Sequence, residues 1–372
     1  MKVRFDTVAI VVTIVISLLL FYKLWNDSKT VNEVKLNENY NPDFSDYILL
    51  KSYDVNKTDK GGFYWWVHMV ASLVELGKIT NKKVLVLFDD GYYLDKNRSE
   101  KSWWNYFFKY PNLTDEEYSM IKEAEKRGFT EVVNIKLKPT RNMYLFTNKT
   151  FQDVMRKIMT TDKTTLVYKD FLRVQPDIDT IVQSFVKDNN IRINNDILIG
   201  VHYRGTDKFF GNGDKEDLLK NKHMSYDHVC DNVQTIYDGI KRDQPDKKVL
   251  VYVASDELPF VQHFKTMFGD DIAISYEAFR VDTCTSGIEL KDDVRAKTHG
   301  NSEHSKMLKH YADQSIHRGN NNVSGYKKGV DAIVDVALLS LCNIYVKTQR
   351  GNFASQPKKW NPNINEIELS QD

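Results

Sequence analysis

Short apolar runs alternate with segments of helical periodicity along most of the chain, and this alternation constrains the fold more than any other feature. The run Val84–Phe88 is apolar throughout. Runs of this kind are typical of strands buried on both faces, as in parallel sheets covered by helices. Between such runs apolar residues recur at helical spacing, for example from Trp65 to Gly77. The alternation therefore predicts an α/β protein built from β-α-β units.

The first half of the chain contains one such unit. A strand is predicted at Tyr47–Leu50, followed by a glycine turn, a helix at Trp65–Gly77 with a left-handed cap at Gly77, and a strand at Val84–Phe88. Acidic residues early and basic residues late predict a helix at Thr114–Arg127. Two further strands are expected, at Val132–Leu137 and Met143–Phe146.

The second half repeats the alternation after two turn-forming segments, Asp188–Asn190 and Asn194–Asp196. Strands are predicted at Ile197–Tyr203, Val249–Ala254, Ile272–Ser275 and Ile344–Lys347, and helices at His223–Arg242, Leu258–Phe268 and Gly329–Cys342. A chain of 372 residues exceeds the usual size of one core. We therefore expect two doubly wound, Rossmann-type domains, residues 44–190 and 191–372, facing a cleft with ligands at the carboxyl ends of the strands.

The N-terminus carries a mostly apolar run, Thr7–Tyr22, between basic residues. As a helix it would be about 24 Å long, enough for a thin bilayer. We predict a cytoplasmic tail at residues 1–6, a transmembrane signal anchor at residues 7–24 and a stem at residues 25–43. A cleaved signal peptide is the alternative, but the run is not followed by the small residues of a cleavage site.

This arrangement predicts a single-pass type II membrane protein whose folded part faces the lumen of the Golgi or the endoplasmic reticulum. Asn-x-Ser/Thr triplets, which accept glycans only in a secretory lumen, support it, although several would occur by chance in an Asn-rich chain. They lie at Asn26, Asn56, Asn97, Asn112, Asn148 and Asn322.

Charge and cysteine content limit the expected partners and the number of disulfide bonds. Lys plus Arg number 52 against 51 Asp plus Glu, and a net charge of +1 gives no field that would hold a polyanion, so nucleic acid is not an expected partner. Three cysteines, Cys230, Cys284 and Cys342, allow at most one internal disulfide. Stability must come from core packing.

The strongest functional signal follows the strand Ile197–Tyr203, where the chain continues into Arg204-Gly205-Thr206-Asp207-Lys208. Cations at the carboxyl end of such a strand suit a pyrophosphate. Arg204 is able to bind phosphate oxygens through two bonds, Lys208 acts as a point charge, and Asp207 can orient either cation. The alternative is a surface turn with solvated charges.

Two further signals involve carboxylates. Ser255-Asp256-Glu257 ends a strand, where the acids would accept hydrogen bonds from a guanine edge or a ribose hydroxyl. Alternatively, Ser255 caps the next helix and the acids stabilise its first turn. Asp335 lies within an apolar helical segment, so it occupies a solvated helix face or is directed at a ligand.

Three weaker patterns have ordinary explanations. Asp177-Ile178-Asp179 resembles a divalent-metal clamp, but it follows Pro176 and begins a predicted helix. The aromatic segment Trp103–Phe108 would suit sugar stacking or a core, and a core is the simpler interpretation. Four histidines, His299, His304, His310 and His317, have no metal-ligand spacing. We therefore expect no metal site.

Taken together, these motifs resemble those of one family. His202-Tyr203-Arg204-Gly205-Thr206-Asp207-Lys208 is similar to the His-x-Arg-x-Thr-Asp-Lys signature of the α-1,6-fucosyltransferase and protein O-fucosyltransferase superfamily, which includes the nodulation fucosyltransferases. Ala254-Ser255-Asp256-Glu257 resembles the family's Ala-Thr-Asp-Asp strand end. Gly329, Asp335 and Leu339-Ser340 resemble its next helix, and Gly61 to Phe88 its opening β-α-β unit.

The resemblance implies a GT-B-like fold, use of GDP-fucose without a metal or other cofactor, and inversion at the anomeric carbon. It implies that Arg204 and Lys208 contact the diphosphate and that Gly61 and Gly62 form an acceptor-side loop. The nucleotide-sugar site that it implies includes His202, Arg204, Thr206, Asp207, Lys208, Tyr226, Ser255, Asp256, Glu257 and Asp335.

The chain departs from the family pattern in two places. Where the family has a Glu proposed as catalytic base, this chain has Phe209–Asn212, so Asp217, Glu216 or Asp214, in that order, would serve if a side-chain base is used. A family Ser on the diphosphate side corresponds to Gly351, which shifts that contact to Thr348, Arg350 or Ser355 if it is kept.

The sequence thus predicts a membrane-anchored glycosyltransferase that transfers fucose from GDP-fucose to a glycan or glycoprotein. One alternative is a transferase that uses another nucleotide sugar. The other is a degenerate GT-B module that binds glycans without turnover, which the altered base region would permit.

Overall fold

The computed structural model describes residues 46–51, 62–126, 172–205, 224–282, 323–348 and 351–369. The chain divides into two compact units, one of Phe44–Ser119 with Glu131–Asp372 and one of Met1–Asp43 with Met120–Thr130. Among the described residues, no helix combines the length and apolar character needed to cross a membrane. The anchor predicted at residues 7–24 lies outside them and stays a prediction.

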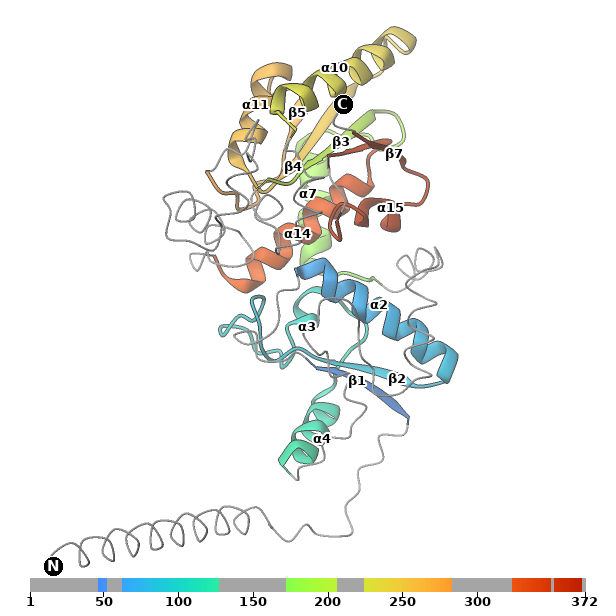
Figure 1. Cartoon of the computed structure of the whole chain (residues 1–372), viewed down its shortest axis with the longest axis vertical. Coiled ribbons are helices and arrows are strands. Elements are labelled where there is room, and N and C mark those ends of the chain that lie inside the picture. The colour runs from blue at the N-terminus through green and yellow to red at the C-terminus, as the bar shows by residue number, and fades with distance from the viewer. Residues whose placement is uncertain are drawn as a thin grey trace, which may run out of the picture. The chain divides into compact units, whose positions relative to one another are not determined.

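The first half contains the predicted β-α-β unit (Figure 1). Strand β1 (Tyr47–Lys51) pairs in parallel with β2 (Lys83–Leu87), so that Ile48 lies beside Val84. Helix α2 (Phe63–Thr80) connects them. Parallel strands need such a crossover because a tight turn reverses the chain direction.

Helix α2 does not end at Gly77, and the predicted cap there is wrong. The helix continues to Thr80, and the left-handed residue is Asn81, with φ of 53°. Gly77 is required for a different reason: a Cβ at this position would lie 2.6 Å from the carbonyl oxygen of Lys82. The close return of the chain into β2 therefore explains the glycine.

Three further helices lie in the described part of this half. They are α3 (Trp104–Phe107), α4 (Asp115–Lys126) and α7 (Pro176–Asp188). Thr114 begins α4 with a capping box: its hydroxyl oxygen accepts from Glu117 N at 3.2 Å, and its own N–H donates to the Glu117 carboxylate at 3.1 Å. The strands predicted at Val132–Leu137 and Met143–Phe146 lie outside the described residues.

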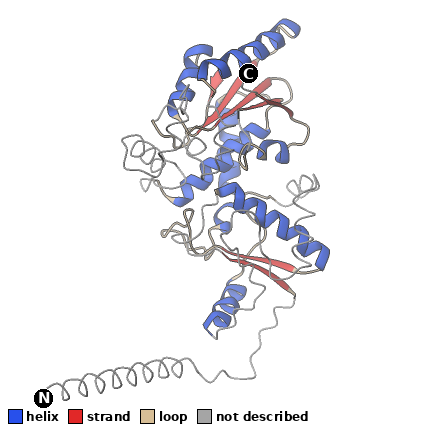
Figure 2. Cartoon of the chain, in the orientation of Figure 1, coloured by secondary structure: helices blue, strands red, loops and turns tan. Residues whose placement is uncertain are grey.

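A five-stranded sheet of order β5-β4-β3-β6-β7 forms the second half, and all its described pairings are parallel (Figure 2). The chain starts in the middle of this sheet, moves outward on one side and then crosses to the other side. That is the doubly wound order, and its switch point lies between β3 and β6. The strands are β3 (Ile197–Tyr203), β4 (Val249–Ser255), β5 (Ala273–Ile274), β6 (Ile344–Lys347) and β7 (Asn365–Glu368).

Helices cover both faces of this sheet. Helices α10 (Tyr226–Asp243) and α11 (Leu258–Phe268) pack in one hydrophobic cluster with alternate residues of the strands, including Val201 and Val253. Helix α14 (Gly325–Ser340) packs on the other face, with Tyr252 and Tyr345. The short helix α15 (Gln356–Trp360) follows β6. The predicted α/β class and parallel sheet are confirmed, whereas the division at residues 190 and 191 stays a prediction.

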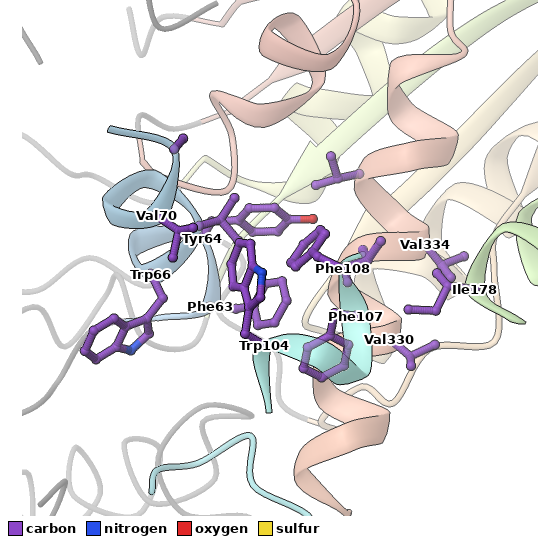
Figure 3. Close-up of a cluster of buried hydrophobic side chains, with 14 of the residues drawn as sticks. Phe63, Tyr64, Trp66, Val70, Trp104, Phe107, Phe108, Ile178, Val330 and Val334 are labelled. Carbon is purple, nitrogen blue, oxygen red and sulfur yellow. The ribbon is translucent and has the colours of Figure 1, made fainter. Parts of the chain in front are cut away.

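The hydrophobic cluster around α14 continues into α2, α3 and α7 (Figure 3). The aromatic segment contributes Trp103, Trp104, Tyr106, Phe107 and Phe108, all buried, so the core interpretation of this segment is confirmed. Two glycines let α14 approach closely. A Cβ at Gly325 would lie 2.5 Å from the backbone of Tyr93, and one at Gly329 would lie 2.2 Å from the ring of Phe107.

We predict that Gly329→Ala lowers the free energy of unfolding by about 1–3 kcal/mol, because the added methyl group overpacks against Phe107. The control is Gly239→Ala on α10, where nothing lies within 4 Å of a Cβ. That change should stabilise the protein by about 0.5–1 kcal/mol through helix propensity. Urea unfolding of both variants checks the pair, and equal effects would contradict the packing argument.

Candidate functional site

The ends of β3 and β4 are joined side by side at the carboxyl edge of the sheet. His202 pairs with Ala254 and Tyr203 with Ser255 in the strand register. Just beyond, the backbone N–H of Gly205 donates to the Asp256 carboxylate at 2.9 Å. This bond fixes the turn that contains the half-buried Arg204 beside Asp256. The structure thus brings Arg204 of the first predicted signal and Asp256 of the second together at the carboxyl ends of β3 and β4, and β3 borders the switch point.

Ser255 and Glu257 have structural roles at this edge. Ser255 does not cap α11, because its hydroxyl oxygen accepts from Glu257 N at 3.0 Å and the N-cap residue is Glu257, with no acid in the first turn. Glu257 is fully buried and accepts a hydrogen bond from the Tyr226 hydroxyl at 2.5 Å. The capping interpretation is therefore wrong. Glu257 instead connects the strand end to the first residue of α10.

His202 points to the other face of β3 and is held by an aromatic stack. Its ring lies 4.5 Å from that of Phe353, at an interplanar angle of 22°. Phe353 in turn meets Tyr64 of α2 edge to face at 5.4 Å. The stack places the imidazole beside the segment that follows β6, where the family resemblance predicts diphosphate contacts.

The hydroxyl groups predicted for the diphosphate side already donate to backbone carbonyls. Thr348 Oγ1 donates to the carbonyl oxygen of His202 at 3.3 Å, and Ser355 Oγ donates to that of Asn352 at 3.0 Å. A phosphate needs donors, and in this structure both hydroxyl protons have other acceptors. Arg350, the third candidate, lies outside the described residues.

Asp335 is buried on α14 and is not on a solvated helix face. The Tyr252 hydroxyl of β4 donates to its Oδ1 at 2.5 Å. Burial raises the pKa of Asp335 to about 6, and the positive charge of Arg280 opposes that rise. A carboxylate with one oxygen bonded and the other without a hydrogen bond to the described residues is able to accept from a ligand N–H.

Arg280 is a candidate site residue that the sequence analysis missed. It follows β5, in a stretch without periodicity, and donates through Nη1 to the carbonyl oxygens of Tyr276 at 2.8 Å and Ala278 at 3.0 Å. Its Nε and Nη2 are buried and have no hydrogen-bond partner in the described part of the chain. Buried donors are normally satisfied, so these two suit a ligand acceptor. No local pattern marks an arginine of this kind.

Asp331, one turn before Asp335 on α14, holds the segment that contains Arg280. It accepts from the backbone N–H of Phe279 at 2.9 Å and forms an ion pair with Lys327. Burial, followed by the charge of Asp331, raises the pKa of the Tyr276 hydroxyl to about 12. Asp331 thus has a positioning role, because its bond fixes the backbone next to Arg280.

Several predicted site residues lie outside the described residues, so their roles stay predictions. These are Gly61, Thr206, Asp207, Lys208, Asp214, Glu216 and Asp217. Gly62 is described and occupies the N-cap position of α2 in an extended conformation, with φ of −71° and ψ of 167°.

The possible metal clamp has ordinary helix-start contacts. Asp177 accepts from the Tyr326 hydroxyl at 2.5 Å, and Asp179 accepts from Gln183 at 2.6 Å. Both lie in the first turn of α7, as the alternative interpretation predicted. Within the described ranges, no group of three or more His, Cys, Asp or Glu side chains could hold a metal ion.

The chain is similar to known proteins in structure but matches none of them in sequence comparisons. No protein-family model and no curated protein matches the chain. NodZ fucosyltransferase from Bradyrhizobium has a TM-score of 0.41 at 11% identity, over 85% of this chain and 93% of that one. A FUT1 variant from Arabidopsis thaliana, in complex with GDP, has a TM-score of 0.44 at 12% identity, over 88% of this chain and 70% of that one. POFUT1 in complex with GDP has a TM-score of 0.46 at 10% identity, over 87% and 97%.

We predict that Asp335→Asn stabilises the protein at pH 7 and that the gain shrinks in acid. The folded-state pKa of Asp335, about 6, is raised above its usual value of 3.8, so the stability due to its neutral form is present below pH 4 and lost as pH rises through 6. An uncharged amide has no such loss, so Asp335→Asn should raise the free energy of unfolding by on the order of 1–3 kcal/mol at pH 7. Urea unfolding at pH 4.5 and 7.5 measures it.

The control for Asp335→Asn is Asp243→Asn at the exposed end of α10, which removes the same charge. A stability difference between Asp335→Asn and the unmodified chain that does not change between the two pH values would contradict the buried-carboxylate argument.

Proposed function

We propose that the chain is a glycosyltransferase that uses a nucleoside diphosphate sugar, with GDP-fucose as the donor. The observation that carries this proposal is the position of Arg204, which directly follows β3 at the switch point of a doubly wound sheet and is held there by the bond between Gly205 and Asp256. Ligands of such sheets bind outside the carboxyl ends of the strands. A guanidinium in this place suits a diphosphate.

The pair Asp335 and Arg280 supports guanine as the base of the donor. A carboxylate accepts from the N–H groups on the Watson–Crick edge of guanine, and a guanidinium donates to O6 and N7, its acceptors. The two side chains are close enough for their charges to interact, and the open donors of Arg280 have no described partner. The resemblance of residues 202–208 to the fucosyltransferase signature favours fucose as the sugar.

The proposed reaction is a displacement at the anomeric carbon. The acceptor hydroxyl oxygen forms the new bond, the bond to the diphosphate oxygen breaks, and GDP leaves with the electron pair while the acceptor proton passes to a base. Arg204 stabilises the negative charge that develops on the diphosphate, and Lys208 would add a second cation. Fixed cations would supply the stabilisation that a metal provides in other transferases, so we propose no metal requirement.

We also propose that the folded part faces a secretory lumen, anchored by residues 7–24 and acting on a glycan or glycoprotein. The apolar run at Thr7–Tyr22 supports this location. Among the Asn-x-Ser/Thr sites in the described ranges, Asn97 and Asn112 are both exposed and thus accessible to glycosylation. Protection of the folded part from protease in sealed microsomes would test the orientation.

Arg204→Ala should lower the rate of GDP-fucose turnover by about a hundredfold or more while the protein stays folded. Loss of a charge-assisted contact to the leaving diphosphate costs about 3 kcal/mol of transition-state stabilisation. Donor hydrolysis without acceptor measures this and separates an enzyme from a glycan-binding module. Arg242→Ala, at an exposed position near the end of α10, is the control. Near-normal turnover of Arg204→Ala would refute the site, and calorimetry with other nucleotide sugars would test the choice of donor.

The base is predicted to be Asp217, before Glu216 and Asp214. Asp217→Asn should keep its affinity for GDP but lose about 10²- to 10⁴-fold in transfer, which is the usual effect of a general base. Glu216→Gln and Asp214→Asn are its matched controls. If all three variants retain transfer within about threefold, the reaction does not use these side chains as bases.

A further inference from the structure

Lys328 is a largely buried lysine without a counter-charge. The residue is 7% exposed, on the first half of α14. Within the described part of the chain its ammonium group makes no hydrogen bond and no ion pair, whereas its neighbour Lys327 pairs with Asp331. Burial lowers the pKa of Lys328, and no neighbouring charge opposes this. A largely buried cation that gains no ion pair is costly to the fold, and an anionic ligand would supply the missing partner.

Lys328 shares a helix stripe with the two acidic residues of the site. Residues 328, 331 and 335 follow the i, i+3, i+7 spacing of one face of α14, and all three side chains are buried. The stripe therefore has a cation at one end and, at the other, a carboxylate bonded to Tyr252. Between them, the Asp331 carboxylate is already paired with Lys327 and accepts from Phe279 N.

The position of Lys328 along the helix places it at the edge where the strands end. Helix α14 leads into β6, which is parallel to β3, so the N-terminal end of α14 lies at the carboxyl edge of the sheet. Lys328 precedes Asp335 by seven residues, about 10 Å of helix. From Tyr252, the partner of Asp335, three residues of strand lead to Ser255, again about 10 Å. Lys328 is thus level with the strand ends that precede Arg204 and Asp256.

The first turns of α14 are held tightly, so the fold fixes this charge in place. Gly325 and Gly329 pack against Tyr93 and Phe107 at distances that leave no room for a Cβ. One turn later, the carbonyl oxygen of Ala332 accepts from the Tyr64 hydroxyl at 2.9 Å. A small rotation of α14 that would expose Lys328 to solvent is opposed by these contacts.

We propose that Lys328 binds the sugar-side phosphate of the nucleoside diphosphate donor. The inference rests on the proposed function, with the base at Asp335 and Arg280. From there the diphosphate extends along the helix stripe toward Lys328, about 10 Å of helix away. The ammonium group acts as a point charge for phosphate oxygens, and the ligand supplies the counter-charge that the protein lacks.

A purely structural role makes the opposite prediction for stability. If the long apolar stem of Lys328 served to fill the core, its replacement would destabilise the protein. Lys328→Met keeps a long apolar side chain and removes the charge. If the charge is retained for a ligand, the ligand-free variant should be as stable as the unmodified chain or more stable, while its affinity for the diphosphate falls.

The test compares GDP with GMP, which lacks the second phosphate, by calorimetry on the whole chain. We expect Lys328→Met to weaken GDP binding about tenfold or more and GMP binding less than about twofold. Lys328→Gln should behave in the same way, and Lys328→Arg should restore much of the GDP affinity. The control is Lys265→Met on α11, which removes an exposed lysine paired with Asp270.

Three results would overturn the assignment. Unchanged GDP affinity in both charge-removing variants, or equal losses for GDP and GMP, would show that Lys328 does not bind the second phosphate. A clear drop in ligand-free stability in both variants, without a selective loss of GDP affinity, would show a structural role. If the unmodified chain binds no GDP at all, the proposed function itself fails, and this outcome is distinct from these three.

Discussion

Helix α14 packs on nearly its whole circumference, and the rest of the structure depends on this packing. One side meets the five-stranded sheet through Tyr252 and Tyr345, and others meet α2, α3 and α7 in the same hydrophobic cluster. Two glycines bring the helix against Tyr93 and Phe107 at a distance that excludes any side chain. Because a close-packed helix cannot shift by small steps, every polar group on it has a fixed position.

The same helix carries buried polar groups that reduce stability. Asp335 has a pKa raised to about 6 by burial, and Lys328 has no counter-charge in the described residues. Each would be less costly as an apolar residue of similar size. A loss of stability of this kind is expected where a site holds charged groups in the orientation that a ligand requires, because binding then does not have to reorient them.

The ends of β3 and β4 connect the packed core to the candidate site. The register of β3 and β4 puts residues 203 and 255 side by side, and the bond from Gly205 to Asp256 extends that pairing beyond the sheet. On the other side of β3, the ring of His202 stacks on Phe353, which contacts Tyr64 of α2. The switch point is therefore fixed on one side by backbone pairing and on the other by aromatic contacts.

The sequence by itself determined most of the elements, because their periodicity is local: the strand at Ile197–Tyr203 and the helix at Leu258–Phe268 were predicted residue for residue, whereas strand β7 was not predicted. It also placed Arg204 and Asp256 at strand ends. Only the tertiary structure decided what meets them. Tyr252 with Asp335, Tyr226 with Glu257, and Arg280 beside α14 join residues distant in sequence, and Gly77 proved to serve chain approach instead of a cap. Such contacts depend on how helices pack on a sheet, and no local pattern encodes that.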